Sequence, residues 1–180
     1  GGTEALRHIL ESFPSEIPPI AIVQHIPPVF SAAFAQRLNT LCPFEVREAM
    51  DGDELKHNRV LIAPGGKQMG IVRRGNALYA QISDAPPVNR HKPSVDYMFN
   101  SAAAIDRFNF VAGLLTGMGA DGARGLKLLR DRGARTIAQN EASCIVYGMP
   151  REAVALGAAE FILPLDDIGS QLLDLASADR

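Results

Sequence analysis

The stretch from Phe110 to Arg130 constrains the fold most strongly, because it joins a strand pattern, a turn pattern and a helix pattern without a spacer. It opens with the apolar run F-V-A-G-L-L, which is typical of a strand buried on both faces of a parallel sheet. The turn that follows contains Gly117, Gly119 and Gly122. Beyond it, Leu126 and Leu129 recur at helical spacing. Ligands of open α/β sheets bind beyond the carboxyl ends of the strands, so a functional site is expected at this turn, where Asp121 is the only ionisable side chain.

The rest of the chain alternates between strand-like and helix-like segments. Buried or half-buried strands are predicted at Ile20–Val23, Phe44–Glu48, Val60–Ala63, Thr136–Ala138 and Phe161–Leu163. Helices are predicted to begin at Thr3, at Ser31, at Ser94, near Pro150 and at Asp166 or Asp167. Two alternating segments flank Arg74-Gly75-Asn76 and predict a hairpin. The fold class is therefore α/β, a doubly wound and mostly parallel sheet flanked by helices, with an antiparallel β-hairpin insertion.

Composition and charge exclude several classes of protein. The chain of 180 residues fits one domain, 1–180. Its 18 basic and 20 acidic residues are spread along the sequence, so it lacks the charge pattern of a protein that binds nucleic acid or an anionic membrane. Cys42 and Cys144 lack metal-ligand spacing, so no metal site is expected, and reduced thiols in a cytoplasmic protein are favoured over a disulfide.

Two residues suit acid–base chemistry. His25 follows the apolar strand ending at Val23 almost directly, which predicts a ring at the carboxyl edge of the sheet, where a general base would lie. A histidine that merely bonds a neighbouring carbonyl is the alternative. Asp121 could orient such a base by accepting the proton of His25 Nδ1, as in a hydrolase triad. An ordinary N-cap of the helix that follows is the alternative for Asp121.

The turn G-M-G-A-D-G at 117–122 also matches the dinucleotide pattern G-x-G-x-x-G, with Glu141 about twenty residues further on. An aspartate inside this pattern would repel the pyrophosphate that a helix N-terminus attracts. The pattern also comes late in the chain, whereas it normally opens the first βαβ unit. A nucleotide-binding α/β module is kept as an alternative.

A compact polar loop holds Asn89, Arg90, His91 and Lys92, and the first three are candidate substrate-binding residues because the Arg fork can recognise acidic groups. A solvated loop is the alternative. Ser31 and Ser143 are possible nucleophiles, but neither lies in a G-x-S-x-G elbow, and Ser31 is better explained as a helix cap.

Segments spread over the whole chain resemble one family. They are I-V-Q-H-I-P-P from Ile22, I-A-P-G from Ile62, P-V-N-R-H-K-P-S-V-D from Pro87, L-T-G-M-G-A-D-G-A from Leu115, A-Q-N-E-A-S from Ala138 and G-M-P-R-E-A from Gly148. In this order they look like the catalytic domain of the bacterial chemotaxis methylesterase family, CheB. The chain departs at Gly66, Gln68 and Gly70 from a more polar run found in many relatives; none of these residues is expected to touch the triad, and a change in the hairpin rim is the expected consequence.

The resemblance implies a serine hydrolase that cleaves the methyl esters of chemoreceptor glutamates and, in many members, deamidates receptor glutamines. It assigns the general base to His25, the orienting acid to Asp121 and an oxyanion-hole N–H to the backbone of Met118. The family's nucleophile is the serine of a G-A-S-T-G-G-like turn after the first strand. This chain starts at the last two glycines of that turn, so the serine is expected two residues before Gly1 and the first strand upstream of it.

The resemblance also implies partners. The expected protein substrates are methyl-accepting chemoreceptors, through which alone the protein would meet the membrane, and no cofactor is expected. A phosphorylatable receiver domain commonly precedes this domain in cis, and no such domain lies within this chain. A non-catalytic receptor-binding relative that has lost the nucleophile remains a second alternative.

Overall fold

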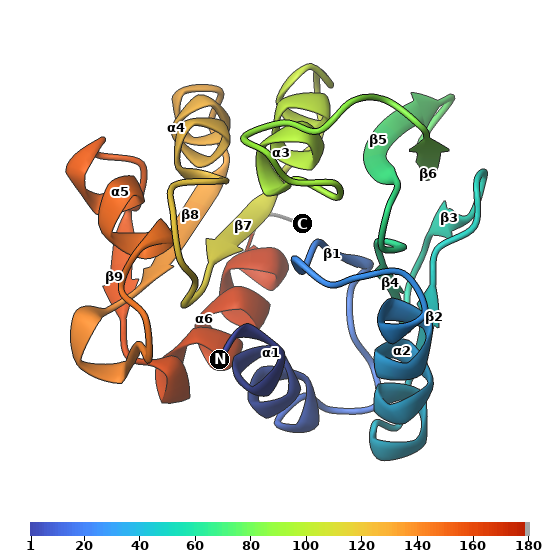
Figure 1. The fold of residues 1–180 in the computed structure, drawn as a ribbon, viewed down its shortest axis with the longest axis horizontal. Helices are drawn as coiled ribbons and strands as arrows, with labels where there is room; N and C mark the ends of the chain where they lie inside the picture. Colours follow the sequence, from blue (N-terminus) through green and yellow to red (C-terminus); the bar gives the residue numbers. More distant parts are fainter. Residues whose placement is uncertain (179–180) are drawn as a thin grey trace.

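The computed structural model describes residues 1–178, so residues 179–180 of the predicted domain lie outside the described part. The chain has the expected α/β architecture, with helices packed around parallel strands (Figure 1). One parallel sheet has the strand order β1-β4-β2 and a second has the order β7-β8-β9. These strands are β1 (Ile20–Ile22), β2 (Glu45–Glu48), β4 (Arg59–Ile62), β7 (Val111–Leu114), β8 (Arg135–Gln139) and β9 (Phe161–Leu163).

The predicted hairpin is confirmed as an antiparallel sheet of order β3-β6-β5. It consists of β3 (Glu54–Leu55), β5 (Gln68–Arg74) and β6 (Ala77–Ser83). Gly75 adopts a φ of +63° in the turn, which explains the glycine there. The short β3 was not predicted, since two residues show no periodicity.

Helices cover both faces of the parallel strands and create two apolar cores. One core contains buried residues of α3 (Val95–Ala103), α4 (Ala123–Asp131) and α5 (Met149–Ala155), and the other contains residues of α1 (Gly2–Glu11), α2 (Phe30–Leu41) and α6 (Leu165–Ala178). In β4, Leu61 packs in the first core, while Val60 and Ile62 pack in the second. All three are 0% exposed, as expected for a parallel strand covered on both faces.

The two parallel sheets are separated by an apolar cleft. Within residues 1–178, β1 pairs only with β4, and β7 pairs only with β8. A cavity of about 900 Å³ lies between their free edges and is lined by both strands together with residues of α1 and α6. The segments after β1 and β7 meet at one edge, so the two strands run in the same direction. A further parallel strand would have backbone partners on both sides in this cleft.

Three helix starts differ from the prediction: that of α2, which begins at Phe30 and not at Ser31, and those of α1 and α6. α1 begins at Gly2 with Gly1 in the N-cap position, so Thr3 lies in the first turn and does not cap the helix. α6 begins at Leu165, just before the acidic pair that was predicted to open it. No helix in the described part of the chain combines the length and apolarity needed to cross a bilayer.

Candidate active site

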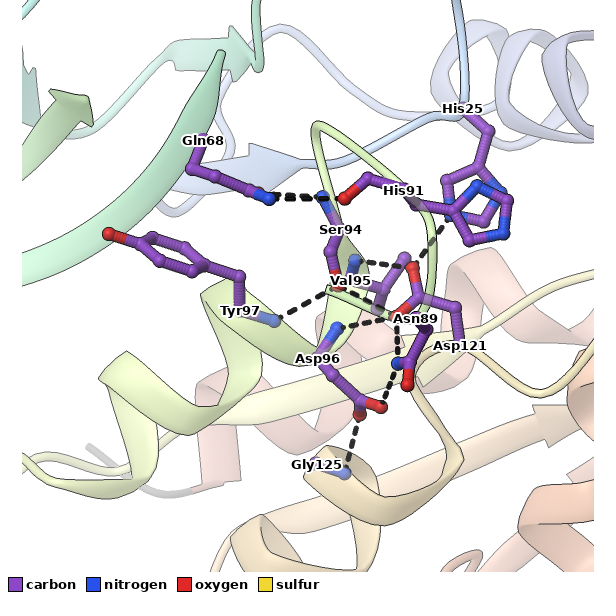
Figure 2. Close-up of polar contacts among 10 residues, drawn as sticks. All are labelled: His25, Gln68, Asn89, His91, Ser94, Val95, Asp96, Tyr97, Asp121 and Gly125. Atoms are coloured by element: carbon purple, nitrogen blue, oxygen red, sulfur yellow. Dashed lines mark hydrogen bonds and ion pairs between the residues drawn. The ribbon is translucent and has the colours of Figure 1, made fainter. Parts of the chain in front are cut away.

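The segments that follow β1 and β7 are joined by a hydrogen bond between His25 and Asp121 (Figure 2). His25 Nε2 lies 2.7 Å from Asp121 Oδ2, although the residues are 96 positions apart. His25 comes from the extended segment after β1, and Asp121 comes from the glycine-rich turn between β7 and α4. The structure therefore brings both residues to one place at the carboxyl edge of the strands.

Asp121 is a buried carboxylate with donors on both oxygens, and its side chain is 0% exposed. Oδ1 accepts from Asn89 Nδ2 at 2.8 Å, Ser94 Oγ at 2.8 Å and Asp96 N at 3.1 Å, while Oδ2 accepts from Val95 N and His25 Nε2, both at 2.7 Å. Burial disfavours the charged carboxylate, but the hydrogen bonds from His25, Asn89, Val95 and Ser94 outweigh it and hold the pKa of Asp121 well below its ordinary value. Asp121 is thus ionised at neutral pH.

This ionisation fixes the proton on His25. A carboxylate can only accept, so Nε2 carries a hydrogen, and in the neutral imidazole Nδ1 is the nitrogen with the lone pair. The expectation that Nδ1 would face the acid is wrong. Nε2 is the ring nitrogen farther from the backbone, and it reaches the buried carboxylate from the neighbouring segment. Nδ1 is consequently the nitrogen available as a base.

Asp121 caps α3 rather than its own helix. The N–H groups of Val95 and Asp96 lie in the first turn of α3, where the helix dipole is positive and favours an anion. α4 has Gly122 in its N-cap position and no side-chain cap, so the N-cap interpretation of Asp121 for α4 is wrong. Ser94, where a helix was predicted to begin, is the N-cap of α3: its Oγ accepts from the N–H of Tyr97 while donating to Asp121.

Asn89 is an exposed residue whose amide group belongs to the network around the acid. Its Nδ2 donates to Asp121 at 2.8 Å and to Asp96 at 2.7 Å, so both amide hydrogens are used within the protein. Asn89 and Arg90 have φ values of +54° and +67°, and the flanking Val88 and His91 exchange backbone hydrogen bonds of 3.0 and 2.9 Å. This geometry is a two-residue hairpin turn with positive φ at both central residues. The turn leaves the Arg90 side chain exposed.

His91 lies face to face with His25. The ring centroids are 3.6 Å apart and the ring planes differ by 3° (Figure 2). Burial and then the neighbouring His25 lower the pKa of His91, against an opposing effect of Asp121. No feature of the local sequence signalled this stack, because the two histidines come from separate loops.

Gln68 fixes the loop that carries these residues. It is 0% exposed, and its Nε2 donates to the carbonyls of Pro86 at 3.2 Å and His91 at 3.1 Å. Its Oε1 accepts from Ser94 N at 2.9 Å. Gln68 contacts neither His25 nor Asp121, in line with the expectation that the departures in this segment do not touch the triad, but it supports the active-site loop from β5.

The glycine-rich turn presents the Met118 backbone to the same region. Gly117 is pinned to the next loop, since its N–H donates to Val146 O at 3.1 Å and its carbonyl accepts from Met149 N at 2.8 Å. The Met118 side chain is exposed, and its N–H makes no hydrogen bond to any residue in 1–178. Met118, His25 and His91 all line the carboxyl end of the 900 Å³ cavity.

Neither serine considered as a nucleophile contacts His25 within the described chain. Ser31 is 0% exposed, donates to Glu48 at 2.5 Å and accepts from Gly65 N at 2.8 Å. Its predicted role as a cap is also wrong, because α2 starts at Phe30 and the Ser31 hydroxyl instead links two strand ends. Ser143 Oγ is occupied locally, with a bond of 2.7 Å to Asn140. Among residues 1–178, no cluster of His, Cys, Asp or Glu side chains is suited to a metal ion.

Fold and site together define a class, that of doubly wound α/β domains with a hydrolase-like pair of a buried acid and a histidine at the carboxyl edge of the sheet. The model of the family described as CheB methylesterase matches residues 1–172. The chain belongs to the CheB methylesterase family.

Named relatives agree with this assignment. A protein-glutamate methylesterase/protein-glutamine glutaminase of Rhodospirillum rubrum is 53% identical over 96% of this chain and 48% of its own length. The protein of the same name from Salmonella typhimurium is 48% identical over 100% of this chain and 52% of its own length. The solved CheB methylesterase catalytic domain of Thermotoga maritima superposes with a TM-score of 0.93 at 35% identity, covering 97% of this chain and 93% of that one. The chain spans about half the length of the curated relatives it matches.

Proposed function

We propose that this chain forms the catalytic domain of a cytoplasmic protein-glutamate methylesterase, which hydrolyses glutamate methyl esters on chemoreceptors and deamidates receptor glutamines by the same route. The observation that carries the proposal is the 2.7 Å contact of His25 with the ionised, buried Asp121 beside the glycine-rich turn. Relatives with both activities in their names support the choice of substrate. The nucleotide-binding alternative has no comparable support, because Asp121 puts a carboxylate inside the G-x-G-x-x-G turn.

We infer further that the nucleophile is a serine carried by a segment that precedes Gly1 and adds a strand between β1 and β7. The apolar cavity of about 900 Å³ and the free edges of both strands support this inference. The first residues of the chain also lie close to the proposed base His25. A Cβ placed on Gly2 would be 2.7 Å from the side-chain amide of Gln24, the residue before His25. A parallel strand in this cleft would end at the edge where Asp121 and His25 meet.

In the proposed reaction, His25 Nδ1 takes the serine proton as the serine oxygen attacks the ester carbonyl carbon. Asp121 stabilises the imidazolium through Nε2–H, and the Met118 N–H donates to the developing oxyanion. The proton on Nδ1 then passes to the departing methoxide, and methanol leaves. Water repeats these steps on the acyl-enzyme and releases the glutamate side chain. With a glutamine substrate, ammonia replaces methanol as the leaving group.

We also propose that Arg90 contacts acidic groups of the receptor segment, because its exposed side chain follows Asn89 in the turn that reaches the acid. Arg90→Glu should weaken turnover of a receptor substrate and spare a small activated ester that cannot reach the guanidinium. Equal losses on both substrates would assign Arg90 a structural role.

The test of the function compares methanol release from a methylated receptor fragment by two proteins. One is the 180-residue chain, and the other is extended upstream by about fifteen residues, enough for a strand of about five residues and its turns. Only the extended protein should release methanol, and His25→Ala should abolish the activity. Receptor binding without methanol release by the extended protein would support the non-catalytic relative instead. Equal release by both proteins would place the nucleophile within the visible chain.

A receiver domain in cis is a further proposal, since this chain matches about half of each relative. A small phosphodonor should then change methanol release by the whole gene product and leave the extended catalytic domain unaffected. The same response from both proteins would argue against such a domain.

A further inference from the structure

We propose that His91 is a positioning residue, whose ring face fixes the plane of His25 so that Nε2 stays on Asp121 and Nδ1 stays aimed at the nucleophile. The inference rests on the proposed function for its catalytic consequence, and on the observed stack for its geometry. It replaces the expected role of His91 in substrate binding.

The stack supplies a restraint that the hydrogen bond alone cannot give. Nε2 makes one hydrogen bond to Asp121, and a ring held at a single atom can still turn about that contact, since the χ2 torsion of histidine is broad. The His91 ring lies 3.6 Å from the His25 ring and within 3° of parallel, so it blocks this rotation from one face. The His25 side chain is 22% exposed, so the remaining freedom lies toward the open site.

The loop that carries His91 is itself held in place at several points. Its turn puts two non-glycine residues, Asn89 and Arg90, at positive φ, a backbone conformation that persists only where the surroundings enforce it. Gln68 holds the His91 carbonyl at 3.1 Å, and Asn89 holds Asp121 at 2.8 Å. The same loop therefore holds the Asp121 carboxylate through Asn89 and fixes the plane of the His25 ring through His91.

Charge favours a neutral His91 in this position. The titratable groups facing the ring pair are the two rings themselves and Asp121, with Asp96 one contact further through Asn89 and Arg90 exposed in the same turn. Two stacked imidazolium ions would repel each other, so a neutral His91 leaves the positive charge of the transition state to His25 beside Asp121. A flat ring that does not ionise should therefore preserve the positioning role of His91, whereas a side chain without a ring should lose it.

The kinetic test uses the upstream-extended protein with His91→Phe, His91→Ala and the control His57→Ala. His57 is an exposed histidine that also lines the cavity, but it precedes β4 and so lies at the opposite, amino edge of the strands from His25. His91→Ala should lower kcat by about 10²-fold with little change in KM, the scale expected when a catalytic group is misplaced by about 1 Å. His91→Phe should stay within about threefold of the parent, because it keeps the flat face. An unchanged kcat in His91→Ala, a rise in KM alone, or a His91→Phe protein as impaired as His91→Ala would each overturn the proposal.

A second readout needs no activity and uses the same upstream-extended proteins. The His25 ring resonances should stay sharp in His91→Phe and should shift and broaden in His91→Ala, while the downfield Nε2–H signal of the bond to Asp121 persists in both. Unchanged ring resonances in His91→Ala would overturn the proposal even if methylesterase activity were never detected. Loss of the Nε2–H signal in His91→Ala would show that His91 supports the loop fold rather than the ring plane, which also overturns it.

Discussion

Replacing Asp121 by Asn tests the central acid most directly. The carboxylate receives hydrogen bonds from Asn89, Ser94 and Asp96 on Oδ1 and from Val95 and His25 on Oδ2. An asparagine that keeps its oxygen toward the Oδ1 donors turns its NH₂ group toward Val95 N–H and His25 Nε2–H, so donors face donors. His25 can respond by moving its proton to Nδ1, which removes the base. Val95 N–H cannot respond and stays buried without an acceptor.

The magnitude follows from these contacts. One buried unsatisfied donor costs about 1–3 kcal/mol, and loss of an anion at the α3 N-terminus costs about 0.3–1 kcal/mol more. We therefore expect Asp121→Asn to lower the free energy of unfolding by about 1–4 kcal/mol at pH 7. In the extended protein the inverted tautomer should lower kcat by about 10⁴-fold, the scale seen when the acid of a triad becomes an amide.

The assays are denaturant unfolding for stability and methanol release for kcat. The matched control is Asp131→Asn, which removes a carboxylate that is 54% exposed and paired with Lys127, where less than about 1 kcal/mol is expected. The reasoning is refuted if Asp121→Asn is no less stable than this control, or if its kcat lies within tenfold of the parent.

The same substitution fixes the sign of a pH dependence. The folded pKa of Asp121 lies below that of the unfolded chain, which is about 3.9. The carboxylate therefore stabilises the fold at pH values above the unfolded pKa, and this contribution is lost as the pH falls below about 4 toward the folded pKa. The stability gap between the parent and Asp121→Asn should accordingly be constant near neutrality and narrow below pH ~4. A gap that widens on acidification would contradict the assignment of Asp121 as an ionised residue.

Three further substitutions test particular contacts. Val29 is 80% exposed and has a φ of +74°, so Val29→Gly should raise the free energy of unfolding by about 1 kcal/mol in a denaturant titration, and a loss would show that the Val29 side chain matters more than its strain. A Cβ on Gly148 would lie 2.5 Å from Gly117 O, so Gly148→Ala should displace the turn that bears Met118, costing about 1–3 kcal/mol of stability and lowering kcat, whereas parent-like values would mean the loop yields freely. Ser31→Ala should lose about 1–3 kcal/mol because Gly65 N–H loses its acceptor, yet keep the parent kcat in the extended protein, and an inactive but stable variant would make Ser31 a nucleophile.

Local sequence determined the elements and the position of the site. The apolar run from 110 to 115 with its glycine turn predicted β7, the turn and α4, and the alternation around Gly75 predicted the hairpin. His25 and Asp121 could be placed at the carboxyl edge because each lies in the segment that follows an apolar strand, and parallel strands share one direction. The start of α3 at Ser94 could also be predicted from the sequence, because an N-cap side chain bonds to a backbone N–H within three residues of itself.

Only the tertiary structure decided which partners these side chains take. Asp121 had a local option as the cap of α4, but it bonds to α3 residues about 25 positions earlier, and His25 reaches it with Nε2 from 96 positions away. The stack of His91 on His25 and the buried amide of Gln68 depend on loops from different strands meeting, and nothing in their immediate sequence records it. The periodicity of apolar residues in the sequence indicates which face of a helix or strand is buried. A buried polar group, in contrast, forms its hydrogen bond with a group on whichever element packs against it. That partner is fixed by the fold and not by the residues beside it in the chain.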